Sequence, residues 1–256
     1  MSLLAIRHLS HAFGGLRAVA DFNLELQPGE LVAIIGPNGA GKTTVFNLIT
    51  GVYRPTEGQI VFQDRSLIGL QPHAIIGAGI ARTFQTIRLF RELTVVDNVR
   101  IAWYGRTSYG LVDAVLRLPR FTREEGRIRR RSMDLLEIFG LAPLAETTSK
   151  NLPYGQQRRL EIARALATQP SLLLLDEPAA GMNPAEIGQL MELIQSIRRE
   201  FHVTLLLIEH QMRVVMGIAE RIKVLDFGQT IAEGTPVQIQ HHPRVIEAYL
   251  GEEEVG

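Results

Sequence analysis

The stretch GPNGAGKTT, residues 36–44, is the most informative part of this sequence. It matches the pattern G-x-x-x-x-G-K-[S/T], follows the apolar run LVAIIG (31–36) and opens the run KTTVFNLIT (42–50), which Gly51 stops. The first run predicts a buried strand and the second a helix. Glycines let backbone N–H groups turn towards a phosphate, and a helix N-terminus adds partial positive charge. The stretch therefore predicts a phosphate-binding loop between a strand and a helix.

This loop supplies most of a predicted nucleotide site. We expect Lys42 to reach the β- and γ-phosphates and the Thr43 hydroxyl to bind Mg²⁺. A glycine-rich turn that merely opens a helix is the alternative, but the flanking strand and helix disfavour it. The predicted nucleotide-binding residues of the loop are Gly36, Pro37, Asn38, Gly39, Ala40, Gly41, Lys42, Thr43 and Thr44.

Composition excludes several classes of protein. The 256 residues suit one large α/β domain, or one domain with a small inserted subdomain. Lys plus Arg and Asp plus Glu both count 27, so net charge gives no indication of nucleic-acid binding. The absence of cysteine excludes disulfides and Cys-ligated metals. No signal-peptide pattern or membrane-length apolar run is found, so we expect a cytosolic protein whose membrane role depends on partners.

Apolar patterning predicts the remaining strands. Alternation in the first thirty residues predicts two antiparallel strands with a turn at Gly14-Gly15. Strands alternating with helices predict a mainly parallel α/β core. The other expected elements are a strand over 59–67, buried strands over 171–177 and 203–210, an amphipathic helix over 185–200, a hairpin over 221–234 turning at Phe227-Gly228, and a frayed tail over 247–256.

Residues 86–140 lack strand patterns and predict a helical insert of about fifty residues. Thr122 and Glu125 form the pattern of a capping box, which predicts that a helix begins there. One face of that helix is expected to be apolar and buried. Its members are Ile128, Ser132, Leu135, Leu136 and Phe139.

The strand LLLLDEP (172–178) ends in two carboxylates. Asp176 is placed to hold Mg²⁺, and Glu177 to polarise an attacking water as general base. Acidic pairs at strand ends are common, and only the phosphate-binding loop upstream makes this pair informative. Taken singly, Gln85, His210 and Phe13 suit ordinary structural roles equally well.

The order of these motifs carries a resemblance. Over roughly residues 3–250, the chain resembles the ATP-binding subunit of ATP-binding cassette (ABC) transporters. The motifs that carry the resemblance are, in order, a phosphate-binding loop, Gln85, a GQ-containing loop at 152–156, the DEP strand end and His210. The resemblance implies a P-loop NTPase core with a mainly parallel sheet, an N-terminal antiparallel β subdomain and a helical subdomain. It implies one ABC ATPase domain over 1–256, with the helical subdomain inserted at about 86–165, and it implies ATP and Mg²⁺ as cofactors.

The stretch LPYGQ (152–156) resembles the family's signature loop, usually LSGGQ. In that family two ATPase domains pair head-to-tail, and each ATP lies between the phosphate-binding loop of one and the signature loop of the other. Gly155 and Gln156 match the pattern. Pro153 replaces the Ser and Tyr154 replaces a Gly, so one hydrogen bond to ATP is in doubt because proline has no N–H. We expect weakened ATP sandwiching.

The resemblance also implies roles for single residues. Phe13 matches the aromatic residue that stacks on adenine, and His210 the histidine that contacts the γ-phosphate. Gln85 matches the glutamine that senses Mg²⁺ and the γ-phosphate, which makes Thr43, Gln85 and Asp176 the metal-binding set. Asn183, in AAGMNP (179–184), stands where the family's dimer-contact loop usually has Asp, which leaves that contact open.

Several further stretches resemble one subgroup, the ATPase subunit of high-affinity branched-chain amino acid importers. They are RTFQTIRLFRELTVVDNV, LPYGQQR, LLIEHQM and AYLGE. The implied partners are a paralogous ATPase or a second copy, two transmembrane permeases and, indirectly, a substrate-binding protein outside the cell, with no nucleic acid. The implied location is the cytoplasmic face of the plasma membrane. Urea or short-chain amide importers, lipopolysaccharide exporters and soluble ABC ATPases remain alternatives.

The segment RLPRFTREEGRIRRR (117–131) holds seven Arg and two Glu. A solvated helix face is one interpretation. Contact with anionic lipid or with a permease's cytoplasmic loop is the other.

Overall fold

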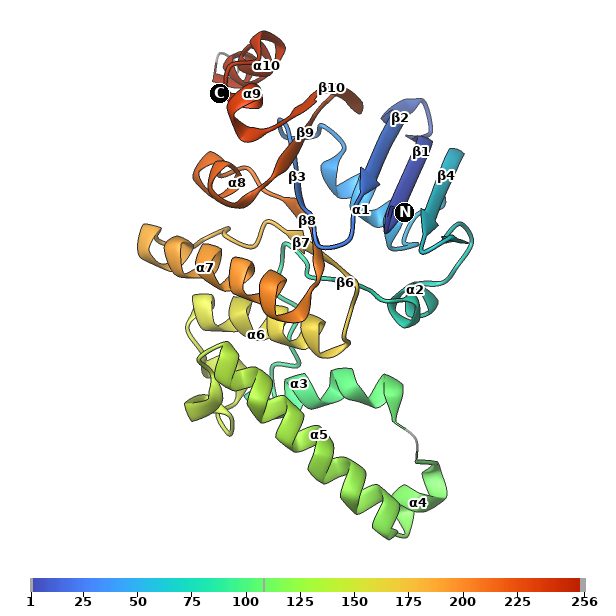
Figure 1. The fold of residues 1–256 in the computed structure, drawn as a ribbon, viewed down its shortest axis with the longest axis vertical. Coiled ribbons are helices and arrows are strands. Elements are labelled where there is room, and N and C mark those ends of the chain that lie inside the picture. Colours follow the sequence, from blue (N-terminus) through green and yellow to red (C-terminus); the bar gives the residue numbers. More distant parts are fainter. Residues whose placement is uncertain (1, 108, 254–256) are drawn as a thin grey trace. The chain divides into compact units, whose positions relative to one another are not determined.

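The computed structural model describes residues 2–107 and 109–253 (Figure 1). The chain divides into two compact units. One combines the described residues up to Arg82 with those from Ser171 onward, and it holds both sheets. The other, Thr83–Pro170, is helical.

The first sheet is antiparallel, with strand order β2-β1-β4-β5. Its strands are β1 (Leu4–Phe13), β2 (Leu16–Leu26), β4 (Glu57–Phe62) and β5 (Arg65–Ser66). The hairpin predicted at Gly14-Gly15 is confirmed. The single strand predicted over 59–67 is wrong, because Gln63 and Asp64 both adopt positive φ and turn the chain back between β4 and β5.

The second sheet has the order β10-β9-β3-β8-β7-β6. Its strands are β3 (Leu31–Ile35), β6 (Ile80–Arg82), β7 (Leu172–Asp176), β8 (Thr204–Ile208), β9 (Arg221–Asp226) and β10 (Gln229–Gly234). All pairs are parallel except the β9–β10 hairpin, so the mainly parallel sheet is confirmed. The middle strands β3, β7 and β8 are buried throughout, as continuous apolar runs require.

The helices of this unit are α1 (Lys42–Ile49), α2 (Pro72–Ala78), α7 (Pro184–Phe201), α8 (Met212–Ile218), α9 (Pro236–Gln240) and α10 (Pro243–Glu253). The helices predicted at 42–50 and 185–200 are confirmed as α1 and α7. The frayed tail predicted over 247–256 is wrong as far as residue 253, because α10 extends to there, and residues 254–256 lie outside the described part. Apolar side chains of both sheets and of α1 form one core cluster.

The helical unit contains α3 (Val95–Trp103), α4 (Leu111–Val115), α5 (Pro119–Ile138) and α6 (Tyr154–Ala167). Short 3₁₀ turns occupy Tyr104–Arg106, Ala142–Leu144 and Ser149–Asn151. Helix α3 packs on both α5 and α6. Within the described ranges, no helix has the length and apolar character needed to span a bilayer.

The long helix α5 begins earlier than its sequence pattern predicted. The capping box at Thr122 and Glu125 is wrong, because Pro119 already opens the helix with Leu118 as N-cap. Proline is favoured at the first helical position, where its fixed φ suits the helix and its missing N–H is not needed. The predicted buried face is confirmed, from Ile128 to Phe139.

Candidate functional site

The phosphate-binding loop connects β3 to α1 and depends on two glycines. Gly36 (φ 147°) and Gly41 (φ 100°) adopt positive φ. A Cβ on Gly36 would lie 2.0 Å from the carbonyl oxygen of Leu225, and one on Gly41 would lie 2.3 Å from that of Ala18. Both positions therefore require glycine, and Gly41 is the N-cap from which α1 starts. The loop and helix predicted from 36–44 are in place.

Lys42 lies buried beneath this loop. Its Nζ donates to the carbonyl oxygens of Gly36, at 2.6 Å, and Pro37, at 2.8 Å. These bonds hold the Lys42 ammonium group against the start of the phosphate-binding loop. Thr43, next in α1, is exposed, so its hydroxyl is accessible for an ion.

Asp176 and Glu177 stand at the carboxyl end of β7. The Asp176 Oδ2 accepts a bond of 2.8 Å from the Nη2 of Arg82, and both side chains are almost fully buried. Arg82 ends β6, the neighbouring strand, and its Nη1 also donates to Asn47 Oδ1 at 2.7 Å. Sequence analysis missed Arg82, because β6 has only three residues and no alternation to reveal it.

Glu177 and His210 are brought together by strand pairing. Asp176 lies in register with Ile208 of β8, so the residues that follow each strand are neighbours. The Nδ1 of His210 is 3.7 Å from Glu177 Oε2. Glu177 adopts a left-handed conformation (φ 46°), and its N–H donates to the carbonyl of Ile208 at 2.8 Å. Strain at such a position is typical of functional sites.

Glu209 supports this pair from within the core. Its buried carboxylate accepts hydrogen bonds from the N–H groups of Ala179, at 3.1 Å, and His210, at 2.8 Å. Burial raises the pKa of the Glu209 carboxyl, although these backbone bonds and the nearby His210 oppose the rise. Glu209 thus ties the loop after Glu177 to His210, a role that the sequence pattern did not reveal.

Phe13 belongs to a cluster of three aromatic rings. It is 44% exposed and packs edge-on against His11, with ring centroids 4.6 Å apart, and against Tyr53, at 5.2 Å. His11 and Tyr53 are stacked at 5.5 Å. A partly exposed aromatic ring held by two neighbouring rings suits stacking on a planar base. Tyr53 was not among the predicted site residues.

The predicted residues of the signature loop, Pro153 to Gln156, lie in the helical unit. Helix α6 begins at Tyr154, with Pro153 as its N-cap, and no side chain caps it. Gly155 and Gln156 therefore fall in its first turn, where backbone N–H groups lack intrahelical acceptors. Asn183, in the other unit, is the N-cap of α7 and forms a capping box with Glu186.

Gln85 lies in a segment that is tied to α6 by a buried ion pair. Arg158 donates to the carbonyl oxygens of Phe84, at 2.6 Å, and Gln85, at 2.7 Å, and to Glu161 Oε2, at 2.7 Å. Glu161 Oε1 in turn accepts from the N–H of Arg88 at 3.2 Å. Both charged side chains are at most 1% exposed. Sequence analysis did not single out this pair, because its spacing is that of any helical salt bridge.

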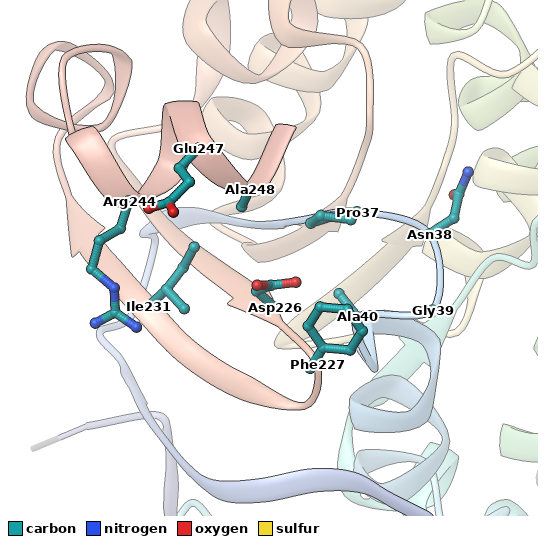
Figure 2. Close-up of a pocket in the computed structure, with 10 residues that line it drawn as sticks. All are labelled: Pro37, Asn38, Gly39, Ala40, Asp226, Phe227, Ile231, Arg244, Glu247 and Ala248. Carbon is teal, nitrogen blue, oxygen red and sulfur yellow. The ribbon is translucent and has the colours of Figure 1, made fainter. Parts of the chain in front are cut away.

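A pocket of about 460 Å³ lies on one flank of the phosphate-binding loop (Figure 2). The loop lines it from Pro37 to Ala40, and α10 contributes Arg244 and Glu247. Asp226 and Phe227, at the β9–β10 turn, form another wall. With two carboxylates against one guanidinium, this flank does not suit a triphosphate. The pocket shows instead that the C-terminal helix lies directly beside the loop.

The sequence profile of the ABC transporter family matches residues 19–180, and that of the branched-chain amino acid ATP-binding cassette transporter matches residues 229–255. The chain belongs to the ABC transporter ATP-binding family. The first match spans the phosphate-binding loop, the α6 signature segment and the DEP strand end. The second covers β10, α9 and α10, and so includes the helix beside the loop.

Curated relatives are similar over nearly their whole length. The high-affinity branched-chain amino acid transport ATP-binding protein LivG of Escherichia coli K12 is 51% identical over 250 residues, covering 98% of each chain. BraF of Pseudomonas aeruginosa, with the same description, is 46% identical with the same coverage. The lipopolysaccharide export system ATP-binding protein LptB of E. coli K12 is 34% identical and covers 99% of each chain.

Solved structures share the fold. The ADP conformation of MJ1267, an ATP-binding cassette of an ABC transporter, superposes with a TM-score of 0.85 at 29% identity, covering 98% of this chain and 99% of that one. The ATP-binding cassette MJ0796, a dimer bound to ADP and phosphate in a post-hydrolysis state, superposes with a TM-score of 0.76 at 26% identity, covering 91% and 98%. The P-loop ABC ATPase fold expected from the resemblance is confirmed.

Proposed function

We propose that this chain is the ATP-binding and ATP-hydrolysing subunit of a membrane importer for branched-chain amino acids. The observation that carries the proposal is a phosphate-binding loop in the same unit as the paired Glu177 and His210 at adjacent strand ends. The C-terminal match to the branched-chain amino acid cassette and the similarity to LivG and BraF support this substrate class. The two units would act together as one ATPase domain.

Nucleotide binding would use the loop and the aromatic cluster. The N–H groups of the loop, which Pro37 alone lacks, would bind the phosphates, and Lys42 would exchange its carbonyl partners for phosphate oxygens. Phe13 stacks on adenine, with Tyr53 supporting the ring. Each of these contacts is made by groups already held in place by the fold.

Mg²⁺ would be held by Thr43 and Asp176 together with the phosphates. A hydroxyl and a carboxylate are hard oxygen ligands, which this ion prefers. Gln85, which lies in the helical unit, remains a ligand predicted from the family resemblance. In the described part of the chain, no group of three or more His, Cys, Asp or Glu forms a cage of its own, which suits an ion that is shared with a nucleotide. When bound, the ion neutralises charge that develops on the phosphates.

Hydrolysis would depend on Glu177 as general base. Its carboxylate accepts a proton from the attacking water, which needs the group held at one position and ionised. The left-handed backbone at Glu177 and its bond to Ile208 fix that position. His210, whose Nδ1 lies 3.7 Å from Glu177 Oε2, would contact the γ-phosphate beside this carboxylate.

The signature segment would bind the nucleotide of a partner ATPase, either a paralogue or a second copy. Pro153 supplies neither an N–H nor a capping hydroxyl, but the N–H groups of Tyr154, Gly155 and Gln156 open the helix at the place where a phosphate binds. The dimer of the MJ0796 cassette shows that a relative of this fold pairs.

Replacing Pro153 with Ser restores one N–H and one hydroxyl at this N-cap. We expect the KM for ATP of the assembled ATPase to fall about fivefold, because one added hydrogen bond contributes roughly 1 kcal/mol. Steady-state ATPase assays over a range of ATP concentrations measure this change. An unchanged KM and rate would show that the N-cap position does not contact ATP.

Replacing Lys42 with Ala removes the ammonium group that is held under the loop. We expect ATP affinity to fall about 10- to 100-fold, the effect of losing a hydrogen bond to a charged group. Binding of a fluorescent ATP analogue measures it, with Lys150→Ala, an exposed lysine paired with Glu92, as the matched control. Equal affinity in both variants would remove Lys42 from the phosphate site.

Co-purification tests the assembly. We expect the tagged chain, extracted from native membranes in mild detergent, to bring down two polytopic permeases and a second ATPase. The permeases would hold it at the cytoplasmic face of the membrane, and a substrate-binding protein outside the cell would deliver the amino acid. Recovery of lipopolysaccharide-export permeases, or of ribosomes without membrane protein, would contradict the importer proposal.

A further inference from the structure

The end of the helical unit formed by α4 and the start of α5 carries exposed apolar side chains. Val115 is 71% exposed, Leu116 is 64% exposed and Leu118 is 37% exposed. They flank Arg117, whose positive φ (48°) turns the chain sharply from α4 into α5. Figure 1 shows this turn at the end of the helical unit remote from α6. This tip of the unit carries exposed aliphatic side chains.

A stripe of arginines continues from this tip along α5. Arg120, Arg123, Arg127 and Arg130 are exposed and recur at spacings of three and four residues, which places them on one helix face. The buried residues of α5, from Ile128 to Leu136, occupy a different face. The stripe is therefore on the outer side of the helix, next to the aliphatic tip.

Most of these guanidinium groups are not neutralised. Arg127 is paired with Glu124. Among the residues that the structure describes, no hydrogen bond or ion pair reaches the guanidinium groups of Arg117, Arg120, Arg123 and Arg130. Asp113 is an acidic neighbour in the tip, and it accepts a hydrogen bond from the N–H of Gly110. The net charge of this surface is strongly positive.

We propose that this surface binds the anionic headgroups of the membrane, with its aliphatic tip entering the interface. We call it the α4–α5 surface, and define it by Val115, Leu116, Arg117, Leu118, Arg120 and Arg123. Interfacial segments combine apolar side chains with Lys or Arg on the polar face, and anionic lipid attracts such segments by charge. Exposed aliphatic side chains beside guanidinium groups suit entry into an anionic lipid interface.

The inference rests on the proposed function only in placing the chain at a membrane. Lipid contact would supply a second attachment, beside the permeases, and would hold the helical unit against the bilayer. Since each arginine near an anionic surface contributes about a fivefold gain in binding, the three arginines of this surface give measurable affinity by themselves.

Sedimentation with vesicles tests this surface on the full-length chain without nucleotide or permeases. We expect binding to vesicles of phosphatidylcholine with phosphatidylglycerol, little binding to phosphatidylcholine alone, and release by high salt. Arg120→Gln/Arg123→Gln should weaken binding about 25-fold, and Leu116→Gln about tenfold. The matched controls, Arg65→Gln/Arg213→Gln and Leu16→Gln, change exposed residues outside the surface and should bind like the wild type.

Three results would overturn the proposal. They are equal binding to both vesicle types, unchanged binding of the surface variants, and loss of permease co-purification in those variants while vesicle binding persists. The last would identify a protein docking surface. Basal ATPase activity, measured on the same preparations, separates the two proposals, because its absence from the wild-type chain would count against the proposed function and not against the lipid surface.

Discussion

Replacing Glu177 with Gln is expected to slow ATP hydrolysis by about 10²- to 10³-fold while leaving ATP binding intact. The amide is nearly the same size as the carboxylate but cannot accept a proton from water, and a positioned general base contributes rate factors of this order. The structure holds Glu177 at the end of β7, with its backbone bonded to Ile208 and His210 beside it. Steady-state turnover and binding of a fluorescent ATP analogue measure the two effects separately.

Glu192→Gln is the matched control for this prediction. Glu192 lies exposed on α7, outside the predicted site, so its variant should hydrolyse ATP at the wild-type rate. If Glu177→Gln turned over ATP as fast as Glu192→Gln, Glu177 would not be the base. If it lost ATP binding as well, its role would be structural.

Replacing Arg158 with Ala is expected to destabilise the protein by about 3–5 kcal/mol. The change leaves Glu161 charged and buried without its partner, and it removes the donor to the carbonyl groups of Phe84 and Gln85. Removing one partner of a buried ion pair typically has a cost of this size. Denaturant unfolding followed by circular dichroism measures the loss.

Two further variants show whether that loss of stability comes from the uncompensated charge of Glu161. Arg158→Met/Glu161→Leu removes both charges and should be destabilised much less than Arg158→Ala alone, because no uncompensated charge remains. Arg129→Ala, which breaks an exposed pair with Glu146, should change stability by no more than about 1 kcal/mol. Equal losses in the single and double variants of the buried pair would show that packing, and not charge compensation, determines the effect.

The sequence was sufficient for the main elements because their local patterns are strong. The run LVAIIG before GPNGAGKTT placed β3 and α1, and the buried runs before Asp176 and His210 placed β7 and β8. In each case a continuous apolar run and a terminating polar residue suffice. The parallel order of these strands then brings Glu177 and His210 together.

Other features depend on tertiary contacts and could not be predicted in this way. Strand β6 is only three residues long, so its sequence shows no periodic pattern. Its pairing with β7, and the contact between Arg82 and Asp176 that depends on this pairing, could therefore not be predicted. The start of α5 was misplaced because Pro119 acts as a start signal that the Thr122 capping pattern obscured. Arg158 and Glu161 have the spacing of any helical salt bridge, and only packing shows that they are buried.

ATP turnover by the reassembled transporter in proteoliposomes measures directly whether this chain drives leucine import. The co-purified permeases and ATPases would be reconstituted with the substrate-binding protein, and ATP hydrolysis would be followed as leucine is added. We expect leucine to stimulate hydrolysis and to be taken up, and Glu177→Gln to slow both by about 10²- to 10³-fold. Stimulation by urea or a short-chain amide instead, or hydrolysis indifferent to leucine, would contradict the assignment of this chain to branched-chain amino acid import.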